Sequence, residues 1–342
     1  MKADMQSFNW YAPGALVMKK AVICGLFTAM VLTQTLAPAL AGTYSIKIGG
    51  GLLGGTLNTF ANGMAVFLTK ANPDIQATVV DSDGSVENLK RIQAGDLDFG
   101  LCYAVDSALG YHGKLPLDNN HYNALRSMGY LYGAPAHLVV RADSEYIKAS
   151  DLKGARVAVG NAGSVTAAGA ERFFRHVGVW DRLKPVFIGY SAAASAFKEG
   201  RVDAFWVLVD YPNPAVVEAS VKVKIRLIDV GIEAEESRLY DTYAFSPTMI
   251  PADTYGRGMP AGISFQDSTL LCVNKDVAEE LVYTVMKSLW SKVGMQTMHA
   301  VKSTFKAMTL QNNFFGAAVP LHPGAVKFWK EQGVTIPAEL MP

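Results

Sequence analysis

Residues 45–60 read SIKIGGGLLGGTLNTF, a short apolar run followed by a glycine-rich segment and the first turn of an amphipathic pattern. The same order of strand, glycine-rich loop and helix returns in VAVGNAGSVT, residues 157–166, where Gly160 stands at the place of Gly49. A second repeated unit, a helix followed by G-x-[LV]-D and a strand, ends at AGDLDFGL and again at EGRVDAFWV. Two ordered repeats at nearly equal offsets predict two similarly built lobes in tandem.

Short β-branched runs alternate with amphipathic helices along the rest of the chain. Runs such as ATVVD, HLVVRA and STLLCV are typical of buried strands, and DVAEELVYTVMKSLW repeats apolar residues at helical spacing. This alternation predicts an α/β fold with two parallel-rich sheets, joined by a two-strand hinge. We expect residues 42–138 to form the first part of lobe I, residues 139–265 to form lobe II, and residues 266–342 to return to lobe I with C-terminal helices. A ligand is then expected between the lobes, at the C-terminal ends of the strands.

The N-terminus carries the pattern of an export signal. Lys19 and Lys20 precede an apolar stretch over residues 21–36, and Ala39 and Ala41 occupy the small-residue positions of a signal-peptidase site. We therefore expect cleavage after Ala41.

On this interpretation residues 1–41 are a signal peptide of the Sec type and the mature protein is periplasmic. Pro38 and its small neighbours end the apolar run too early for a membrane anchor, which needs about 20 apolar residues. The sequence leaves open whether translation starts at Met1 or at Met18.

The composition argues against several classes of function. Half of the 342 residues are hydrophobic, 18% are charged and the formal net charge is +1, so there is no basic excess that would indicate a nucleic-acid partner. The six histidines form no H-E-x-x-H motif, and there is no G-x-S-x-G motif, so we expect no metal site, no cofactor and no catalytic residues. Cys102 and Cys272 lie in apolar runs; buried thiols are the simpler hypothesis, and a disulfide between them stays open.

Gly49, Gly51 and Gly54 spell G-x-G-x-x-G, which suggests a dinucleotide-binding loop. That fold also needs an acidic residue about 20 positions on. Here the next strand-terminal acid, Asp81, comes later, and free dinucleotides are scarce outside the cytoplasm. A tight turn with a purely structural role is a second hypothesis. The third is an anion site, because glycines let a ligand approach the backbone and a helix starting near Thr56 points its unpaired amides there.

The loop GNAGSVT of lobe II is also glycine-rich and also precedes a predicted helix, so it can present backbone amides to an anion in the same way. It adds the hydroxyls of Ser164 and Thr166 and the amide of Asn161. Ser164 is also explained as a helix cap, without any ligand. Two loops that can bind anions and face one cleft favour a clamp for a small carboxylate.

With these loops in place, the sequence resembles the TAXI family, the extracytoplasmic solute receptors of one class of TRAP transporters. The likeness extends over residues 45–337. It rests on the order and spacing of six segments: IGGGLLGGT, DGSVENLKRIQAGDLDFGL, DLKGARVAVGNAGSVT, GRVDAFW, IPADTYG and VPLHPGAVKFWKEQG.

The resemblance implies a two-lobe periplasmic binding protein fold of type II that closes on a small organic acid or amino acid, with glutamate and 2-oxoglutarate typical. It also implies delivery of that ligand to a TRAP membrane permease driven by an ion gradient. The ligand contacts that carry over by position are Gly50, Gly51, Gly55, Thr56, Asn58, Ser85, Tyr103, Asn161, Ser164, Val165 and Thr166.

The sequence departs from the family pattern around this site. Leu52, Leu53 and Leu57 stand where small polar, glycine or aromatic residues are common, and Asp210 stands where glycine is expected. A less polar carboxylate is one consequence, and an amine-bearing one follows if Asp210 or Asp106 faces the cleft.

Aromatic residues beside Asp210 complete the predicted site. Trp206 and Tyr211 are candidates for apolar walls of the cleft, and a place in the core is the equal alternative for both; strand alternation favours the core for Phe205. A periplasmic sensor or an enzyme on the same two-lobe fold remains the alternative function.

Overall fold

The structure is a computed structural model that describes residues 43–342. The predicted signal peptide, residues 1–41, lies outside the described residues. Within them, no helix combines the length and the apolar character that crossing a bilayer requires.

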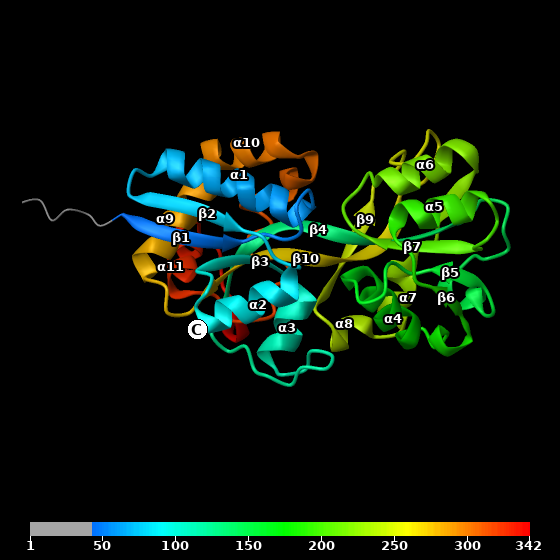
Figure 1. The fold of residues 1–342 in the computed structure, drawn as a ribbon, viewed down its shortest axis with the longest axis horizontal. Helices are drawn as coiled ribbons and strands as arrows, with labels where there is room; N and C mark the ends of the chain where they lie inside the picture. Colours follow the sequence, from blue (N-terminus) through cyan, green and yellow to red (C-terminus); the bar gives the residue numbers. More distant parts are fainter. Residues whose placement is uncertain (1–42) are drawn as a thin grey trace, which may run out of the picture. The chain divides into compact units, whose positions relative to one another are not determined.

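Ten strands of the described chain form one mixed sheet (Figure 1) in the order β2-β1-β3-β10-β4-β7-β5-β6, with β8 paired to β4 and β9 paired to β10. Strand β1 pairs in parallel with β2 and β3, and β5 pairs in parallel with β6 and β7, as the repeated units predict. The strands are β1 (Tyr44–Gly49), β2 (Ile75–Val80), β3 (Phe99–Tyr103), β4 (Leu125–Arg141), β5 (Arg156–Ala158), β6 (Lys184–Val186), β7 (Ala204–Leu208), β8 (Ile225–Leu227), β9 (Phe245–Ile250) and β10 (Gly262–Asn274).

Helices cover both faces of the sheet. In Figure 1, α1 and α10 lie on one side of the strands β1 to β3, and α2 and α3 lie on the other. The α-helices are α1 (Thr56–Ala71), α2 (Ser85–Ala94), α3 (Ala104–Tyr111), α4 (Val165–His176), α5 (Tyr190–Lys198), α6 (Pro214–Lys222), α7 (Val230–Glu236), α8 (Leu239–Thr242), α9 (Glu279–Leu289), α10 (Lys292–Val301) and α11 (Pro323–Glu331). Short 3₁₀ turns are η1 (Ala149–Leu152), η2 (Trp180–Arg182), η3 (Ser303–Ala307) and η4 (Ala338–Leu340).

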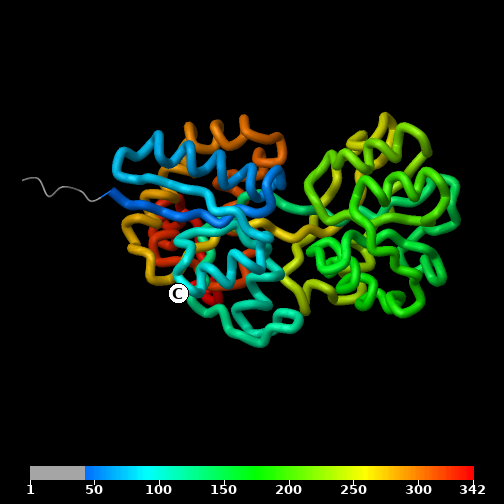
Figure 2. Tube along the Cα trace, viewed as in Figure 1, coloured from blue at the N-terminus to red at the C-terminus, as the bar shows by residue number. Residues whose placement is uncertain are grey.

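Two long strands, β4 and β10, connect the parallel strands β1 to β3 with the parallel strands β5 to β7. Strand β4 pairs with β10 up to Pro135 and with β7 from Ala136 onward, so it belongs to both halves of the sheet (Figure 2). We call the part built on β1, β2 and β3 lobe I, and the part built on β5 to β8 lobe II. The boundaries expected from the sequence, 138/139 and 265/266, fall inside β4 and β10.

Helix α1 shows why the segment after the glycines folds as it does. Phe60, Ala61, Met64 and Leu68 recur at helical spacing and are buried in the core of lobe I. Its N-terminal residue is preceded by Gly55, whose lack of a side chain leaves the first turn without a side-chain cap. The unpaired amides of this turn therefore remain open to a partner from outside the helix.

The first glycine of the G-x-G-x-x-G motif makes room for another side chain of the protein. A Cβ atom on Gly49 would lie 2.4 Å from Oδ1 of the buried Asn88. The Asn88 amide donates to the carbonyl oxygens of Gly49 (3.3 Å), Gly50 (2.8 Å) and Leu101 (2.8 Å), and so ties the loop to β3. Gly49 is thus required by internal packing, which accounts for one glycine of the motif without a nucleotide.

The two cysteines lie on neighbouring strands. Cys102 is on β3 and Cys272 is on β10, and both are fully buried free thiols. Their burial agrees with the simpler of the two sequence hypotheses.

Candidate ligand-binding site between the lobes

The two glycine-rich loops stand at the start of α1 in lobe I and at the start of α4 in lobe II. Ser164 caps α4, because its hydroxyl oxygen accepts a hydrogen bond from the Ala167 amide at 3.1 Å. No side chain caps α1. The predicted helix cap is therefore confirmed in lobe II, whereas the first-turn amides of α1 have no side-chain partner.

Several side chains that the resemblance assigned to the ligand already serve the loops themselves. The Asn58 amide donates to Asp81 Oδ1 at 3.0 Å, and the Thr166 hydroxyl lies 2.6 Å from the hydroxyl of Tyr190. Ser85 Oγ accepts from the amide of Tyr103 at 2.9 Å. These side chains hold the loops in place, and the donors left for a ligand are mainly backbone N–H groups.

A polar bridge joins the lobes beside the first loop. Asp210, which follows β7 in lobe II, forms an ion pair with Lys302 of lobe I at 2.6 Å and accepts a hydrogen bond from Thr304 at 2.7 Å. Thr56 lies between them: its hydroxyl accepts from Lys302 Nζ at 2.7 Å and is 3.4 Å from Asp210 Oδ1. The Asp210 carboxylate is thus neutralised by the protein, rather than being left for an amine of the ligand.

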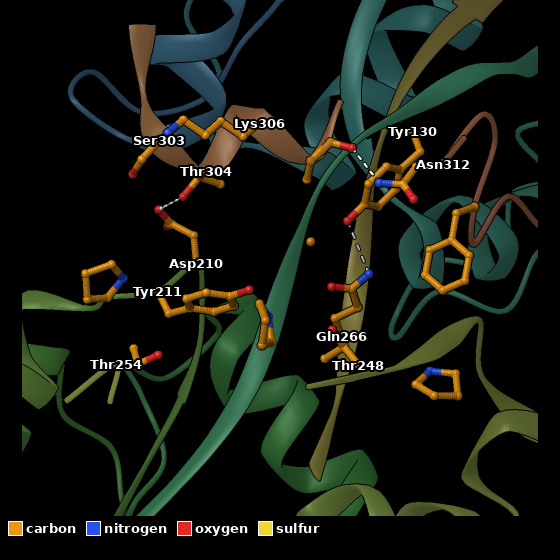
Figure 3. Close-up of a pocket in the computed structure, with 16 residues that line it drawn as sticks. Tyr130, Asp210, Tyr211, Thr248, Thr254, Gln266, Ser303, Thr304, Lys306 and Asn312 are labelled. Carbon is orange, nitrogen blue, oxygen red and sulfur yellow. Dashed lines mark hydrogen bonds between the residues drawn. The ribbon is translucent and has the colours of Figure 1, made fainter. Parts of the chain in front are cut away.

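A cavity of about 760 Å³ lies next to this bridge and takes residues from both lobes and from the strands β4 and β10. Figure 3 shows the Asp210 carboxylate pointing to Thr304 on one side, and Gln266 and Tyr130 in contact on another. Within the described part of the chain, Asp210 and the further candidate Tyr211 are the residues predicted for the site that line this cavity. Thr254 belongs to the segment IPADTYG, and the other lining residues come from outside the six segments of the resemblance.

The three leucines that depart from the family pattern have different environments. Leu52 and Leu53 are exposed at the tip of the loop, by 65% and 84%, whereas Leu57 is buried in the core of lobe I. Of these three leucines, Leu52 and Leu53 are therefore the two whose side chains can be reached from solvent.

The prediction that Trp206 forms a wall of the cleft is corrected by the structure. Trp206 is fully buried in lobe II, where its ring stacks on Phe173 with centroids 5.4 Å apart and contacts Phe265. Phe205 is also fully buried, as strand alternation suggested, but on the opposite face. Helices cover both faces of this parallel-rich sheet, so alternation does not distinguish an open face from the core.

A buried histidine connects β4 to the segment after β7. His137 Nδ1 donates to the carbonyl of Pro135 at 2.9 Å, and Nε2 accepts from the hydroxyl of Tyr255 at 2.8 Å, which in turn accepts from the Asn213 amide. The Pro135 carbonyl can only accept, so Nδ1 carries the proton, and Nε2 of the neutral ring accepts from Tyr255. Burial lowers the pKa of His137 to about 4.

The neutral His137 predicts a specific acid sensitivity. The unfolded chain takes up this proton near pH 6.5 and the folded chain only near pH 4, so its contribution to stability is complete above pH 6.5 and is lost as the pH falls through this window. We expect a loss of about 3 kcal/mol in the free energy of unfolding, at 1.36 kcal/mol for each pH unit. Urea unfolding of the protein and of its His137→Gln variant, from pH 7 to pH 4, gives this term as their difference. Parallel curves for the two proteins would contradict the assignment.

Among residues 43–342 there is no group of three or more histidine, cysteine or acidic side chains arranged to hold a metal ion. The chemistry that these residues offer is the recognition of charged and polar groups by backbone amides, hydroxyls and ion pairs.

Solved structures to which this chain is similar include solute-binding proteins. A TctC solute binding protein from Polaromonas matches with a TM-score of 0.51 at 18% identity, covering 79% of this chain and 89% of that one. The periplasmic aliphatic sulphonate binding protein SsuA from Escherichia coli matches with a TM-score of 0.48 at 15% identity, covering 84% and 82%. An ancestral arginine-binding protein matches with a TM-score of 0.44 at 14% identity, covering 76% and 97%.

The match to the TctC protein confirms the predicted α/β two-lobe fold of periplasmic binding proteins. At the level of sequence, the model of the NMT1-like family matches residues 48–333. The chain therefore belongs to the NMT1-like family.

Proposed function

We propose that this protein is the extracytoplasmic solute receptor of a TAXI-type TRAP transporter. It captures a small organic acid or amino acid between its lobes, in the periplasm, and delivers it to the membrane permease subunits. In this proposal residues 1–41 are the cleaved signal peptide, residues 42–138 and 266–342 form lobe I, and residues 139–265 form lobe II. The protein acts by binding and release, without catalysis.

The observation that carries the proposal is the uncapped start of α1. Its first-turn amides have no side-chain partner, and they stand at the end of a glycine-rich loop that leaves the backbone accessible. The positive end of the helix dipole adds to these donors, which is the arrangement that suits a carboxylate. The Asp210–Lys302 ion pair, which joins lobe II to lobe I beside Thr56, supports the same proposal.

Thermal unfolding in the presence of organic acids and amino acids tests the proposal. A ligand that binds only the folded state stabilises it by about 2.7 kcal/mol at a hundredfold excess over its dissociation constant. We expect at least one carboxylate to raise the midpoint and to be recovered unchanged by mass spectrometry. If no carboxylate shifts the midpoint, or if one is converted to a product, the receptor function is wrong.

A further inference from the structure

Two polar side chains of the long connecting strands line the cavity between the lobes. Gln266 of β10 and Tyr130 of β4 are only 6% and 4% exposed, and Gln266 Nε2 donates a hydrogen bond to the Tyr130 hydroxyl at 3.3 Å. A glycine on β4 makes room for this arrangement, because a Cβ atom on Gly133 would lie 1.8 Å from Gln266 Oε1. The place of the Gln266 amide is thus set by the strands themselves.

This pair keeps one acceptor and one donor for a partner outside the protein. Among the described residues, none donates a hydrogen bond to Gln266 Oε1, and none accepts the proton of the Tyr130 hydroxyl, whose oxygen accepts from Nε2. Burial raises the pKa of Tyr130 to about 12, so the phenol keeps its proton at neutral pH. A hydroxyl group both donates and accepts and so satisfies the pair, whereas a carboxylate only accepts and an ammonium group only donates.

The apolar part of the lining consists largely of aromatic rings and prolines. Phe315 packs edge-on against Tyr130, with ring centroids 5.7 Å apart, and is 41% exposed. Figure 3 shows Tyr211, from lobe II, on the opposite side of the view from Tyr130. The prolines are Pro135, Pro212 and Pro247. Such walls suit a flat ring, and a volume of about 760 Å³ is in the range of small-ligand sites.

The cavity lies beside the proposed carboxylate site. Asp210 lines it, and Asp210 Oδ1 is 3.4 Å from the hydroxyl of Thr56, the first residue of α1. Lys302 neutralises Asp210, so the bridge places no net charge between the two. A ligand bound through its carboxylate at the start of α1 therefore has this cavity next to it for the rest of its atoms.

The cationic side chain of the lining lies away from the polar pair. Lys306 is exposed and has no ion-pair partner among residues 43–342, and in Figure 3 its side chain extends toward Ser303 and away from Gln266. A second carboxylate at Gln266 would therefore meet an acceptor oxygen and aromatic rings, with no cation beside it. This end of the cavity is unsuited to an aliphatic dicarboxylate.

We propose that the cavity selects a carboxylate that carries a hydroxylated aromatic ring, with the ring held by the aromatic and proline walls and the hydroxyl group bound by Gln266 and Tyr130. This inference rests on the proposed function and names its substrate class. It departs from the glutamate and 2-oxoglutarate that the family resemblance makes typical.

Matched pairs of ligands test the inference on the unmodified protein. Titration calorimetry compares 4-hydroxybenzoate, 4-hydroxyphenylacetate and 3-(4-hydroxyphenyl)propanoate with the same acids lacking the hydroxyl group, and with succinate, L-glutamate and 2-oxoglutarate. We expect at least one hydroxylated acid to bind at least about tenfold more tightly than its parent and than the aliphatic acids. Equal binding within every pair, or tighter binding of an aliphatic acid, overturns the inference and leaves the receptor function intact. Binding of no carboxylate overturns both.

Variants separate recognition of the hydroxyl group from a structural role of the polar pair. For Gln266→Leu we expect at least about a tenfold loss of affinity for the hydroxylated acid and less than about a threefold change for its parent. Tyr130→Phe keeps the buried ring, should lower the same preference, and serves alone if Gln266→Leu does not fold. Gln296→Leu, at an exposed position of α10 outside the cavity, is the matched control and should change neither affinity.

A change at Gly133 tests the pair without altering either of its members. Gly133→Ala places a methyl group where the Gln266 amide lies, so the flexible end of that side chain must move. We expect the preference for the hydroxylated acid to fall at least about fivefold, by the same calorimetry. An equal loss for both members of a pair in all three cavity variants would show that Gln266 and Tyr130 only support the fold, and would overturn the inference.

Discussion

Replacing Trp206 with alanine is expected to lower the free energy of unfolding by about 3–5 kcal/mol, the usual result of deleting a large buried aromatic side chain. The indole is fully buried and contacts Phe173, Phe174 and Phe265, so its removal leaves a cavity that these rings cannot close without losing their own contacts. Urea unfolding at pH 7 measures the change. A loss of stability this large is expected because the Trp206 side chain lies in the core of lobe II.

Phenylalanine at the same position is the matched control. The indole N–H of Trp206 has no hydrogen-bond partner among the described residues, so Trp206→Phe loses ring volume but no polar contact and should cost much less than the alanine variant. The folded alanine variant should still bind ligand with nearly the affinity of the unmodified protein. A small loss of stability together with a large loss of affinity would show instead that Trp206 forms a wall of the ligand site.

Replacing Gly55 with aspartate is expected to weaken carboxylate binding by about 100-fold or more. Gly55 has the extended backbone of a helix N-cap, with φ −73° and ψ 163°, and aspartate is among the residues favoured there. The new carboxylate would accept hydrogen bonds from the first-turn amides of α1 and so occupy the place of the ligand. Charge-assisted hydrogen bonds contribute about 1.5–3 kcal/mol each, and two of them account for the expected loss. Titration calorimetry with the best ligand of the thermal screen measures it.

The stability of this variant provides an internal check. A cap on α1 should raise the free energy of unfolding by a few tenths of a kcal/mol, after a small movement of the loop, because a Cβ on Gly55 lies 3.0 Å from the Leu52 carbonyl oxygen. Gly55→Asn caps the helix without a charge and should weaken binding less. Unchanged affinity in both variants would remove the start of α1 from the site.

The fold could be predicted from the sequence because its signals are local. Each repeated unit joins a β-branched run, a glycine-rich loop and a helix, and the parallel pairing of β1 with β3 and of β5 with β7 follows from this order. The crossing of the chain between lobes was also visible, since HLVVRA and STLLCV belong to the long strands β4 and β10.

The site could be predicted less well because its contacts join distant parts of the chain. Nothing near Asp210 in the sequence indicates Lys302 or Thr304 as its partners, and nothing near Asp106 indicates Arg172. Polar side chains that looked available, such as those of Thr166 and Asn58, are occupied by Tyr190 and Asp81. Hydrogen bonds of this kind depend on the tertiary structure, so a local motif cannot reveal them.

Titration of the purified protein with the carboxylates that raise its unfolding midpoint tests the central claim most directly. A solute receptor should bind one ligand per chain, in competition with other carboxylates that bind, and mass spectrometry should recover that ligand unchanged after hours of incubation. Binding should fall by about 100-fold or more in the Gly55→Asp variant. Absence of binding to every carboxylate, or conversion of a bound one into product, would contradict the account.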